Sequence, residues 1–208
     1  MIKKFELDLS SKITVFGIEL FRIKALISFS DVEKGELGGY VEKEENLSHS
    51  GDAWVYGDAW VYGDAEVSGD AEVSGNARVS GNARVSGNAE VSGNARVSGN
   101  AWVYGDAWVY GDAEVSGNAR VSGNARVSGN AEVYGDAEVS KLNDYIVFKN
   151  NWSSGRYFTY TRSNKMWRVG CFYGTGEELI KKAYQDSKDS GKHYEAYVNL
   201  VKTLEQEE

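Results

Sequence analysis

The sequence contains no proline among its 208 residues, although average usage would give about ten. Every residue after the first can therefore donate a backbone N–H, as a long ladder of β-strands requires. Histidine is almost as scarce, since His49 and His193 are the two present. Two histidines cannot supply the three ligands of a three-histidine zinc site.

Cysteine, long apolar runs and basic charge are also in short supply. Cys171 is the single cysteine and cannot form a disulfide within the chain, so we expect a reducing compartment and a cytoplasmic location. No stretch of 18 apolar residues occurs, and residues 1–8 lack the apolar core of a signal peptide, so we expect no contact with a membrane. The 23 basic residues are outnumbered by 31 acidic ones, and the formal charge of −8 argues against binding to nucleic acid.

What the chain does have is a repeat that fills residues 51–140. This segment is fifteen uninterrupted copies of a six-residue unit, Gly-(Asp/Asn)-Ala-(Trp/Glu/Arg)-Val-(Ser/Tyr), in which Gly, Ala and Val never vary. Ala, the variable residue and Val alternate inward, outward and inward, as residues of a β-strand do. Gly and Asp or Asn tolerate positive φ, so we expect this pair to form a corner.

Strands this short cannot cover an ordinary sheet, but three of them wound into a triangular coil can stack their Val and Ala side chains into a dry column. Three units then make one turn of a parallel β-helix, and fifteen units make five turns. An α-helix is excluded because a glycine at every sixth position and a β-branched valine do not suit a 3.6-residue period. The corner carboxylates are spread over three edges and do not converge on Ca²⁺, so we predict no metal and no cofactor.

From Val55 and Ala59 to the end of the repeat, each aliphatic residue is followed four positions later by a small one. This pattern resembles the hexapeptide-repeat family of left-handed parallel β-helices. The resemblance implies the left-handed sense, which periodicity alone does not give. It is weakly specific for function, because this fold hosts acyltransferases, scaffolds and binding proteins alike.

Two flanking segments are expected to close the column. Residues 1–50 are predicted to form an N-terminal cap with a β-hairpin about Gly17 and a degenerate first rung at Val41 and Leu47, before an insertion of two residues. Residues 141–208 are predicted to form a small α+β unit with strands at 145–148, 157–161 and 166–172 and two helices separated by 189–191. The complete prediction is a mainly β protein, a left-handed parallel β-helix of about five to six coils with a β cap and a βββαα unit.

The flanks carry a second, narrower resemblance. Residues 21–26 (Phe-Arg-Ile-Lys-Ala-Leu), 35–40 (Gly-Glu-Leu-Gly-Gly-Tyr) and 46–48 (Asn-Leu-Ser) are similar to the leader of hexapeptide-repeat proteins encoded by phages and prophages. Residues 170–175 (Gly-Cys-Phe-Tyr-Gly-Thr), followed by two helices, are similar to their C-terminal unit. This resemblance implies a phage or prophage setting, and hence a host cytoplasm, more than it implies an activity.

The nearest enzymes by fold are the hexapeptide acyltransferases, in which a histidine in a cleft between trimer subunits acts as a general base beside a loop that leaves the coil. In this chain neither histidine lies in the repeat, and no loop interrupts it. We therefore predict no catalytic residue and keep an acyltransferase that uses His49 as a rival interpretation. Cys171 is expected to be a packed small residue in a strand, because a nucleophilic cysteine needs a partner base.

Variable residues that lie three units apart fall into three outward columns. The columns are Trp54, Glu72, Glu90, Trp108 and Arg126; Trp60, Arg78, Arg96, Glu114 and Glu132; and Glu66, Arg84, Trp102, Arg120 and Glu138. The third column alternates in a way that suits salt bridges and cation–π contacts. The first two place like charges over each other, which costs only about a few tenths of a kcal/mol per contact on a wet surface.

Four Trp–Tyr pairs are predicted to stand exposed on outer strands: Trp54/Tyr56, Trp60/Tyr62, Trp102/Tyr104 and Trp108/Tyr110. They form an apolar surface that a monomer rarely leaves wet, and Trp, Tyr and Arg are enriched at binding hot spots. Together with Arg84 and Arg120, these eight residues are the predicted binding residues. The pairs also suit a repeat copied by duplication, because the block from Gly51 recurs at Gly99.

The sequence thus favours a non-enzymatic scaffold or binding protein that self-associates, as a homotrimer by preference, and displays Trp, Tyr and Arg on a rigid column. One alternative is a phage accessory factor that inhibits a host defence protein or sequesters a nucleotide signal, because these side chains suit base stacking and phosphate contact. The other alternative is the acyltransferase. The expected partners are further copies of the chain, a host protein or a small nucleotide.

Overall fold

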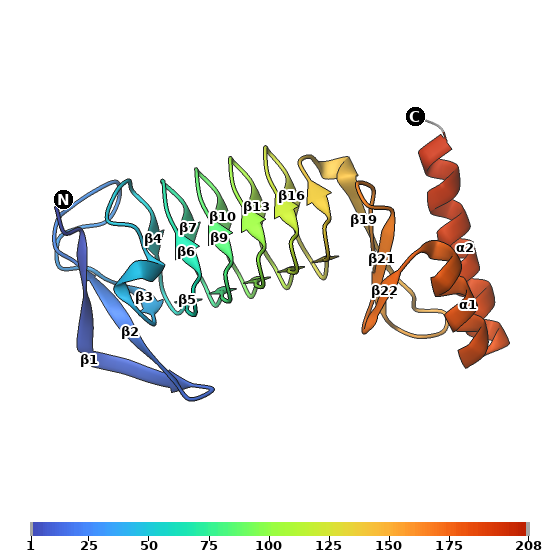
Figure 1. Cartoon of the computed structure of the whole chain (residues 1–208), viewed down its shortest axis with the longest axis horizontal. Coiled ribbons are helices and arrows are strands. Elements are labelled where there is room, and N and C mark those ends of the chain that lie inside the picture. Colours follow the sequence, from blue (N-terminus) through green and yellow to red (C-terminus); the bar gives the residue numbers. More distant parts are fainter. Residues whose placement is uncertain (1, 207–208) are drawn as a thin grey trace. The chain divides into compact units, whose positions relative to one another are not determined.

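The computed structural model describes residues 2–206, and the chain divides into two compact units that are described separately (Figure 1). The first unit ends at Leu142 and holds the N-terminal segment together with the whole repeat. The second begins at Asn143 and holds the C-terminal segment. The N-terminal segment therefore packs in the same unit as the coil that it was expected to cap.

The repeat forms a three-sided parallel β-solenoid, whose successive coils run from cyan to yellow in Figure 1. We call its sides face 1, face 2 and face 3. Face 1 comprises β4 (Trp54–Val55), β7 (Glu72–Val73), β10 (Glu90–Val91), β13 (Trp108–Val109) and β16 (Arg126–Val127). Face 2 comprises β5 (Trp60–Val61), β8 (Arg78–Val79), β11 (Arg96–Val97), β14 (Glu114–Val115) and β17 (Glu132–Val133). Face 3 comprises β6 (Glu66–Val67), β9 (Arg84–Val85), β12 (Trp102–Val103), β15 (Arg120–Val121) and β18 (Glu138–Val139).

Strands that lie three units apart pair in parallel and in register, so equivalent positions of the six-residue unit lie directly over one another. Each turn donates backbone N–H groups to the next turn, as Arg96 N does to Ala113 O and Ser98 N to Val115 O, both at 2.9 Å. The Val and Ala side chains of all fifteen units are at most 1% exposed, which makes the interior a dry apolar column. A parallel β-helix of five regular turns and a degenerate first one is confirmed, and its left-handed sense stays a prediction.

The Asp or Asn of each corner has a structural role that the sequence analysis missed. We expected these residues to supply positive φ, and this was wrong: among residues 2–206, no Asp or Asn adopts it, whereas the glycine of each corner does. The side chains instead form ladders, in which Asn82 Nδ2 donates to Asn100 Oδ1 at 3.0 Å, Asn100 to Asn118 at 3.0 Å and Asn118 to Asp136 at 2.9 Å. The rise of about 4.8 Å per turn brings stacked amides within hydrogen-bond reach.

The predicted N-terminal hairpin is present and longer than expected. It consists of β1 (Phe5–Val15) and β2 (Ile18–Ala25), and β2 also pairs with β3 (Leu37–Val41). Since β3 pairs in parallel with β5, the hairpin extends the sheet of face 2. After a 3-10 helix (Glu44–Asn46), the chain completes the degenerate rung: Val41 lies against Val61 and Leu47 against Val67. Each spacing is two positions longer than that between regular strands, which confirms the insertion.

The lowest turn of the regular coil needs other donors for some of its carbonyl groups, because the degenerate rung beneath it is incomplete. Lys4 is 2% exposed, and its Nζ donates to Gly51 O at 3.0 Å and to Ala53 O at 2.7 Å. The fully buried Asn46 donates through Nδ2 to the corresponding two carbonyls of another corner, at 3.0 and 2.8 Å. Two side chains thus replace four backbone donors.

The second unit is a four-stranded antiparallel sheet covered by two helices. Its elements are β19 (Tyr145–Lys149), β20 (Tyr157–Thr161), β21 (Met166–Val169), β22 (Phe172–Gly174), α1 (Gly176–Asp186) and α2 (Lys188–Gln206), after a 3-10 helix (Leu142–Asp144). Its core gathers Phe158, Trp167 and Tyr194 with aliphatic residues of both helices.

Two details of the second unit differ from the prediction. The expected strand 166–172 divides into β21 and β22 because Gly170, at φ +56°, turns the chain back, and Cys171 lies exposed in that turn. The helices are separated at Ser187 and not at 189–191. Gly191 lies inside α2 because the helix packs closely there: an added Cβ would be 2.3 Å from the Tyr184 ring.

Replacement of corner glycines should separate backbone strain from contact between turns. At Gly87 (φ +70°) an added Cβ would lie 3.0 Å from Gly105 N, whereas at Gly129 (φ +64°) it would meet nothing within 4 Å. Gly129→Ala should cost about 1–2 kcal/mol from the left-handed conformation alone. Gly87→Ala should cost more, seen as a lower urea midpoint by circular dichroism. Equal losses for the two variants would contradict close stacking of the corners.

Lys4 should give the stability a dependence on alkaline pH. Burial lowers the pKa of Lys4 to about 8 from 10.5, although Asp52 and Asp70 nearby favour its charged form. Because the unfolded chain holds this proton more tightly, the free energy of unfolding should rise between pH 8 and 10.5. Urea unfolding at about pH 7.5 and about pH 9.5 should show this rise in the native protein and not in Lys4→Met. The same rise in both proteins would refute the assignment.

Candidate functional site

Two of the four predicted aromatic pairs lie on the outer wall of the coil in fixed conformations; Trp102 is exposed, and Tyr104, Trp108 and Tyr110 are half-buried. The rings of Trp102 and Tyr104 lie 4.5 Å apart, and those of Trp108 and Tyr110 lie 4.6 Å apart. Each indole also donates its Nε1–H to a serine of the turn below, Trp102 to Ser86 at 3.1 Å and Trp108 to Ser92 at 3.0 Å. The pairs are therefore ordered before any partner arrives.

Trp54, predicted to be exposed, is completely buried, and this corrects the expectation of four exposed pairs. Its ring meets the edges of Phe5 and Phe29, with ring centroids 6.3 and 5.4 Å away. The reason is its place in the lowest strand of face 1, where the N-terminal segment covers it. Its Nε1–H is buried without a hydrogen-bond partner. The neighbouring Gly38 has no side-chain hydroxyl that could accept this hydrogen.

The rest of this first aromatic block is engaged by neighbouring side chains. Tyr56 donates its hydroxyl to Asp31 Oδ1 at 2.8 Å, and burial together with this carboxylate raises the pKa of Tyr56 well above 10. Trp60 lies under the guanidinium of Arg78, whose Cζ is 4.3 Å from the ring centroid. Tyr62 lines a small gap beside Val15, Ile18 and Leu20 of the hairpin. The block at residues 51–62 therefore serves mainly to seat the cap.

Arg84 and Arg120 stand directly below and above Trp102 in the ladder of face 3, as predicted. The salt bridges expected in this column are present: Arg84 Nε lies 3.8 Å from Glu66 Oε2, and Arg120 Nη1 lies 3.3 Å from Glu138 Oε1. We call Arg84, Trp102, Tyr104 and Arg120 the face 3 patch. Trp102 is 37% exposed there, so the patch suits stacking and contact with anions.

Faces 1 and 2 carry the like-charge neighbours that the columns predicted. Glu72 is paired in register with Glu90 on face 1, and Arg78 with Arg96 on face 2. The pKa of Glu72 is raised, first by burial and then by the neighbouring carboxylates of Asp31 and Glu90. Arg96 has an internal partner, because its Nη1 donates to Glu114 Oε1 at 2.9 Å.

His49 lies at the N-terminal end of the coil with both ring nitrogens engaged. Nδ1 accepts the backbone N–H of Lys4 at 3.2 Å, so Nε2 carries the proton and donates it to Glu44 Oε1 at 2.7 Å. The ring stacks on Phe5, with centroids 4.4 Å apart. A hollow of about 540 Å³ opens beside it, lined also by Glu66 and Ser68. In this arrangement the imidazole offers no unprotonated nitrogen to a substrate.

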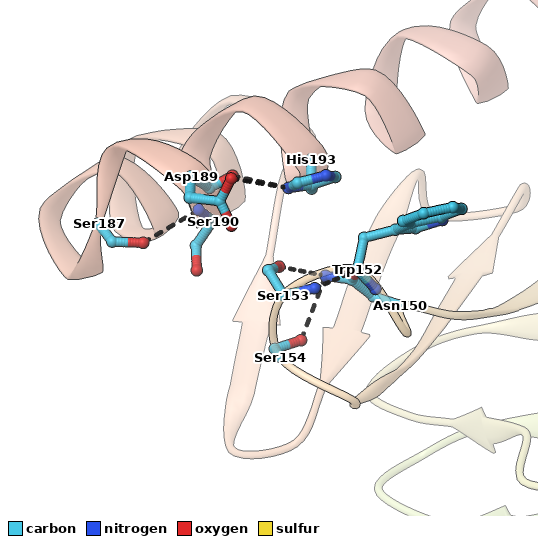
Figure 2. Close-up of polar contacts among 8 residues, drawn as sticks. All are labelled: Asn150, Trp152, Ser153, Ser154, Ser187, Asp189, Ser190 and His193. Carbon is cyan, nitrogen blue, oxygen red and sulfur yellow. Dashed lines mark hydrogen bonds and ion pairs between the residues drawn. The ribbon is translucent and has the colours of Figure 1, made fainter.

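A loop of the second unit displays an aromatic residue that the sequence analysis did not select. Figure 2 shows Trp152 directed away from the loop that carries it, where it is 77% exposed. The fully buried Asn150 holds the loop: its Oδ1 accepts the N–H of Trp152 and of Ser153, and its Nδ2 donates to Ser153 Oγ at 2.8 Å. The sequence feature that could have predicted this exposed residue is a tryptophan within a turn-forming run of Asn, Ser and Gly.

The remaining polar features of the second unit are local. His193, the other histidine, lies on α2 with Nδ1 2.9 Å from Asp189 O, one turn earlier (Figure 2). A pocket of about 420 Å³ is lined by Tyr145, Tyr160 and Arg162, and the Tyr160 hydroxyl donates to Glu205 Oε1 at 2.6 Å. Burial and this carboxylate raise the pKa of Tyr160.

The described residues 2–206 contain neither a metal-binding cluster nor a membrane-spanning helix. In this range no group of three or more His, Cys, Asp and Glu side chains is placed to hold a metal ion. The helices of the same range are too short or too polar to cross a membrane.

Comparison with models of known protein families supports the fold. The model of the YdcK beta solenoid repeat matches residues 71–87, 77–93, 89–105, 95–111, 113–129 and 119–135. These overlapping segments lie wholly within the repeat and cover less than half of the chain. A comparison with curated proteins gives no match. The chain is therefore a repeat β-solenoid protein, and its repeat is similar to the YdcK beta solenoid repeat.

Proposed function

We propose that this protein is a non-enzymatic, self-associating binding protein, in which a rigid β-solenoid displays Trp, Tyr and Arg side chains. A phage or prophage setting, implied by the resemblance of its flanks, is part of this proposal. The observation that carries it is the pre-ordering of Trp102/Tyr104 and Trp108/Tyr110 on a column whose core does not need them. Fixed aromatic side chains lose little conformational entropy on binding, which favours affinity.

The state of His49 supports a binding protein over an acyltransferase. Its Nδ1 accepts a backbone N–H and its Nε2–H is bonded to Glu44, so a general base would require both contacts to break. These contacts tie Lys4, and with it the start of β1, to the end of the coil. A structural role for His49 in the cap explains the same contacts without a reaction.

Self-association is tested by the mass in solution. Light scattering should give a multiple of the 22.9 kDa chain mass for the native protein. The variant Trp108→Ser, on face 1, should weaken association by about ten-fold or more, because aromatic anchors dominate interfaces. Trp152→Ser, which removes an exposed tryptophan outside the repeat, is the matched control and should keep the native mass. A native protein of 22.9 kDa at every concentration would refute self-association.

Sequestration of a nucleotide is the second candidate, favoured by the two arginines that flank Trp102 in register. A base stacked on Trp102 would place its phosphates near Arg84 or Arg120. Titration with ATP should then quench the tryptophan emission, and Arg84→Gln/Arg120→Gln should abolish the quenching. No saturable quenching in the native protein would remove this candidate and leave a host protein or a second copy as the partner of the face 3 patch.

A further inference from the structure

Two faces of the solenoid place like charges next to each other, whereas the third places opposite charges next to each other. On face 3, opposite charges neighbour each other, and Glu66–Arg84 and Arg120–Glu138 form salt bridges. On faces 1 and 2, Glu72 neighbours Glu90 and Arg78 neighbours Arg96 across a parallel ladder. If the charges were arranged only for pairing within one molecule, opposite charges would be neighbours on all three faces.

Faces 1 and 2, which place like charges next to each other, are complementary to each other in charge. Each turn passes face 1 and then face 2, so equivalent residues of consecutive units stand at one level of the column on adjacent faces. Glu72 shares its level with Arg78, Glu90 with Arg96, and Arg126 with Glu132; each of these pairs has opposite charge. Side by side at equal height, face 1 of one column would therefore meet opposite charge on face 2 of another at these three levels.

We propose that face 1 of one copy packs against face 2 of a second copy, with the two columns parallel and in register. This inference rests on the proposed self-association and names the surfaces that carry it. Opposite charges aligned across an interface fix its register and exclude wrong pairings. The contact is heterologous, so every open assembly keeps one unused face 1 and one unused face 2, and it either grows as an array or closes into a ring.

Charges from the N-terminal segment extend the same match. Asp31 lies beside Glu72, whose pKa it helps to raise, so the acidic strip of face 1 consists of Asp31, Glu72 and Glu90. At the lower end of face 2, Arg22 in β2 lies in the same row as Arg78 and Arg96, with Tyr40 and Trp60 between Arg22 and Arg78. Arg22 Nη2 lies 3.2 Å from Asp58 Oδ1 at the corner between the two faces.

The arginines of face 2 can take a further partner in their observed conformations. The Arg78 guanidinium lies over the Trp60 ring, and a cation–π contact of this kind does not take up all of its N–H donors. Arg96 bonds Glu114 through Nη1, while its side chain stays 58% exposed. A guanidinium has five N–H donors, so a carboxylate of another copy can be bound beside the internal one.

An antiparallel contact of face 2 with itself is the main competing arrangement. It would oppose Arg78 to Glu132 and Arg96 to Glu114, so it also matches charge. However, it would leave the acidic strip of Asp31, Glu72 and Glu90 without a basic partner. The contact between faces 1 and 2 satisfies both strips and is therefore preferred.

The test uses two full-length variants with opposite charge changes. Glu72→Arg/Glu90→Arg makes the lower halves of both faces basic, and Arg78→Glu/Arg96→Glu makes them acidic. Each variant alone should associate at least about ten-fold more weakly than the native protein in about 0.15 M NaCl, measured by analytical ultracentrifugation. A 1:1 mixture should associate again, and so should the chain that carries all four changes. Thermal unfolding establishes that each variant is folded.

A matched control exchanges an internal ion pair outside the repeat, Glu177→Lys/Lys202→Glu, whose charged atoms lie 2.6 Å apart, and should leave association at the native level. Native-like association of Glu72→Arg/Glu90→Arg alone would overturn the inference and favour the antiparallel contact of face 2. A mixture that stays dissociated would overturn it as well. In both cases association of the native protein would leave the proposed function standing, whereas a monomeric native protein would remove the two together.

Discussion

The structure depends on one constraint, the stacking of every third six-residue unit in register around a dry core of valine and alanine. Burial of fifteen Val and fifteen Ala side chains drives this stacking, since apolar burial contributes about 25 cal/mol per Å². A corner glycine with positive φ lets the chain turn and lets the next turn approach, as the 3.0 Å contact that a Cβ at Gly87 would make shows. A residue inserted into one unit would move Val from the core to the surface in every later turn.

The same constraint turns the outer wall into a grid. Because equivalent positions lie over one another, each corner can form an amide ladder, such as Asn82–Asn100–Asn118, that ends on the acceptor Asp136. Each face carries a fixed order of charges and rings. Face 3 satisfies its own charges and presents Trp102 between two arginines, while the charges of faces 1 and 2 match between copies. On this account two faces assemble the protein and the third contacts a partner.

Much of this architecture was predictable from the sequence because the repeat states its own period. The inward positions, the turn of three units, the hairpin at Gly17 and the shifted rung of Val41 and Leu47 all follow from spacing. The burial of Trp54 did not follow, because the repeat makes it equivalent to Trp102 and only its place at the end of the column sets it apart. The side-chain ladders were not predicted, because the tendency of Asp and Asn to occur in turns already explained their presence at the corners.

The candidate site was predictable only in part, for a similar reason. The ladder of face 3 brought Arg84, Trp102 and Arg120 together as the column predicted, since register fixes neighbours. Trp152 was missed because its display depends on the buried Asn150, and burial outside a repeat cannot be taken from spacing. The hydrogen bonds of His49 likewise depend on the path of the N-terminal segment over the end of the coil.

Disulfide trapping tests the register of three units per turn most directly. In a Cys171→Ser background, Ser80→Cys/Ser98→Cys places two cysteines on successive strands of face 2, whose spacing of about 4.8 Å suits a disulfide. Ser80→Cys/Ser92→Cys places the second cysteine on face 1 instead. The account predicts that mild oxidation of dilute protein, followed by mass spectrometry, gives an internal disulfide in the first variant and free thiols in the second. Equal oxidation of both, or preferential oxidation of the second, would contradict the stacked column.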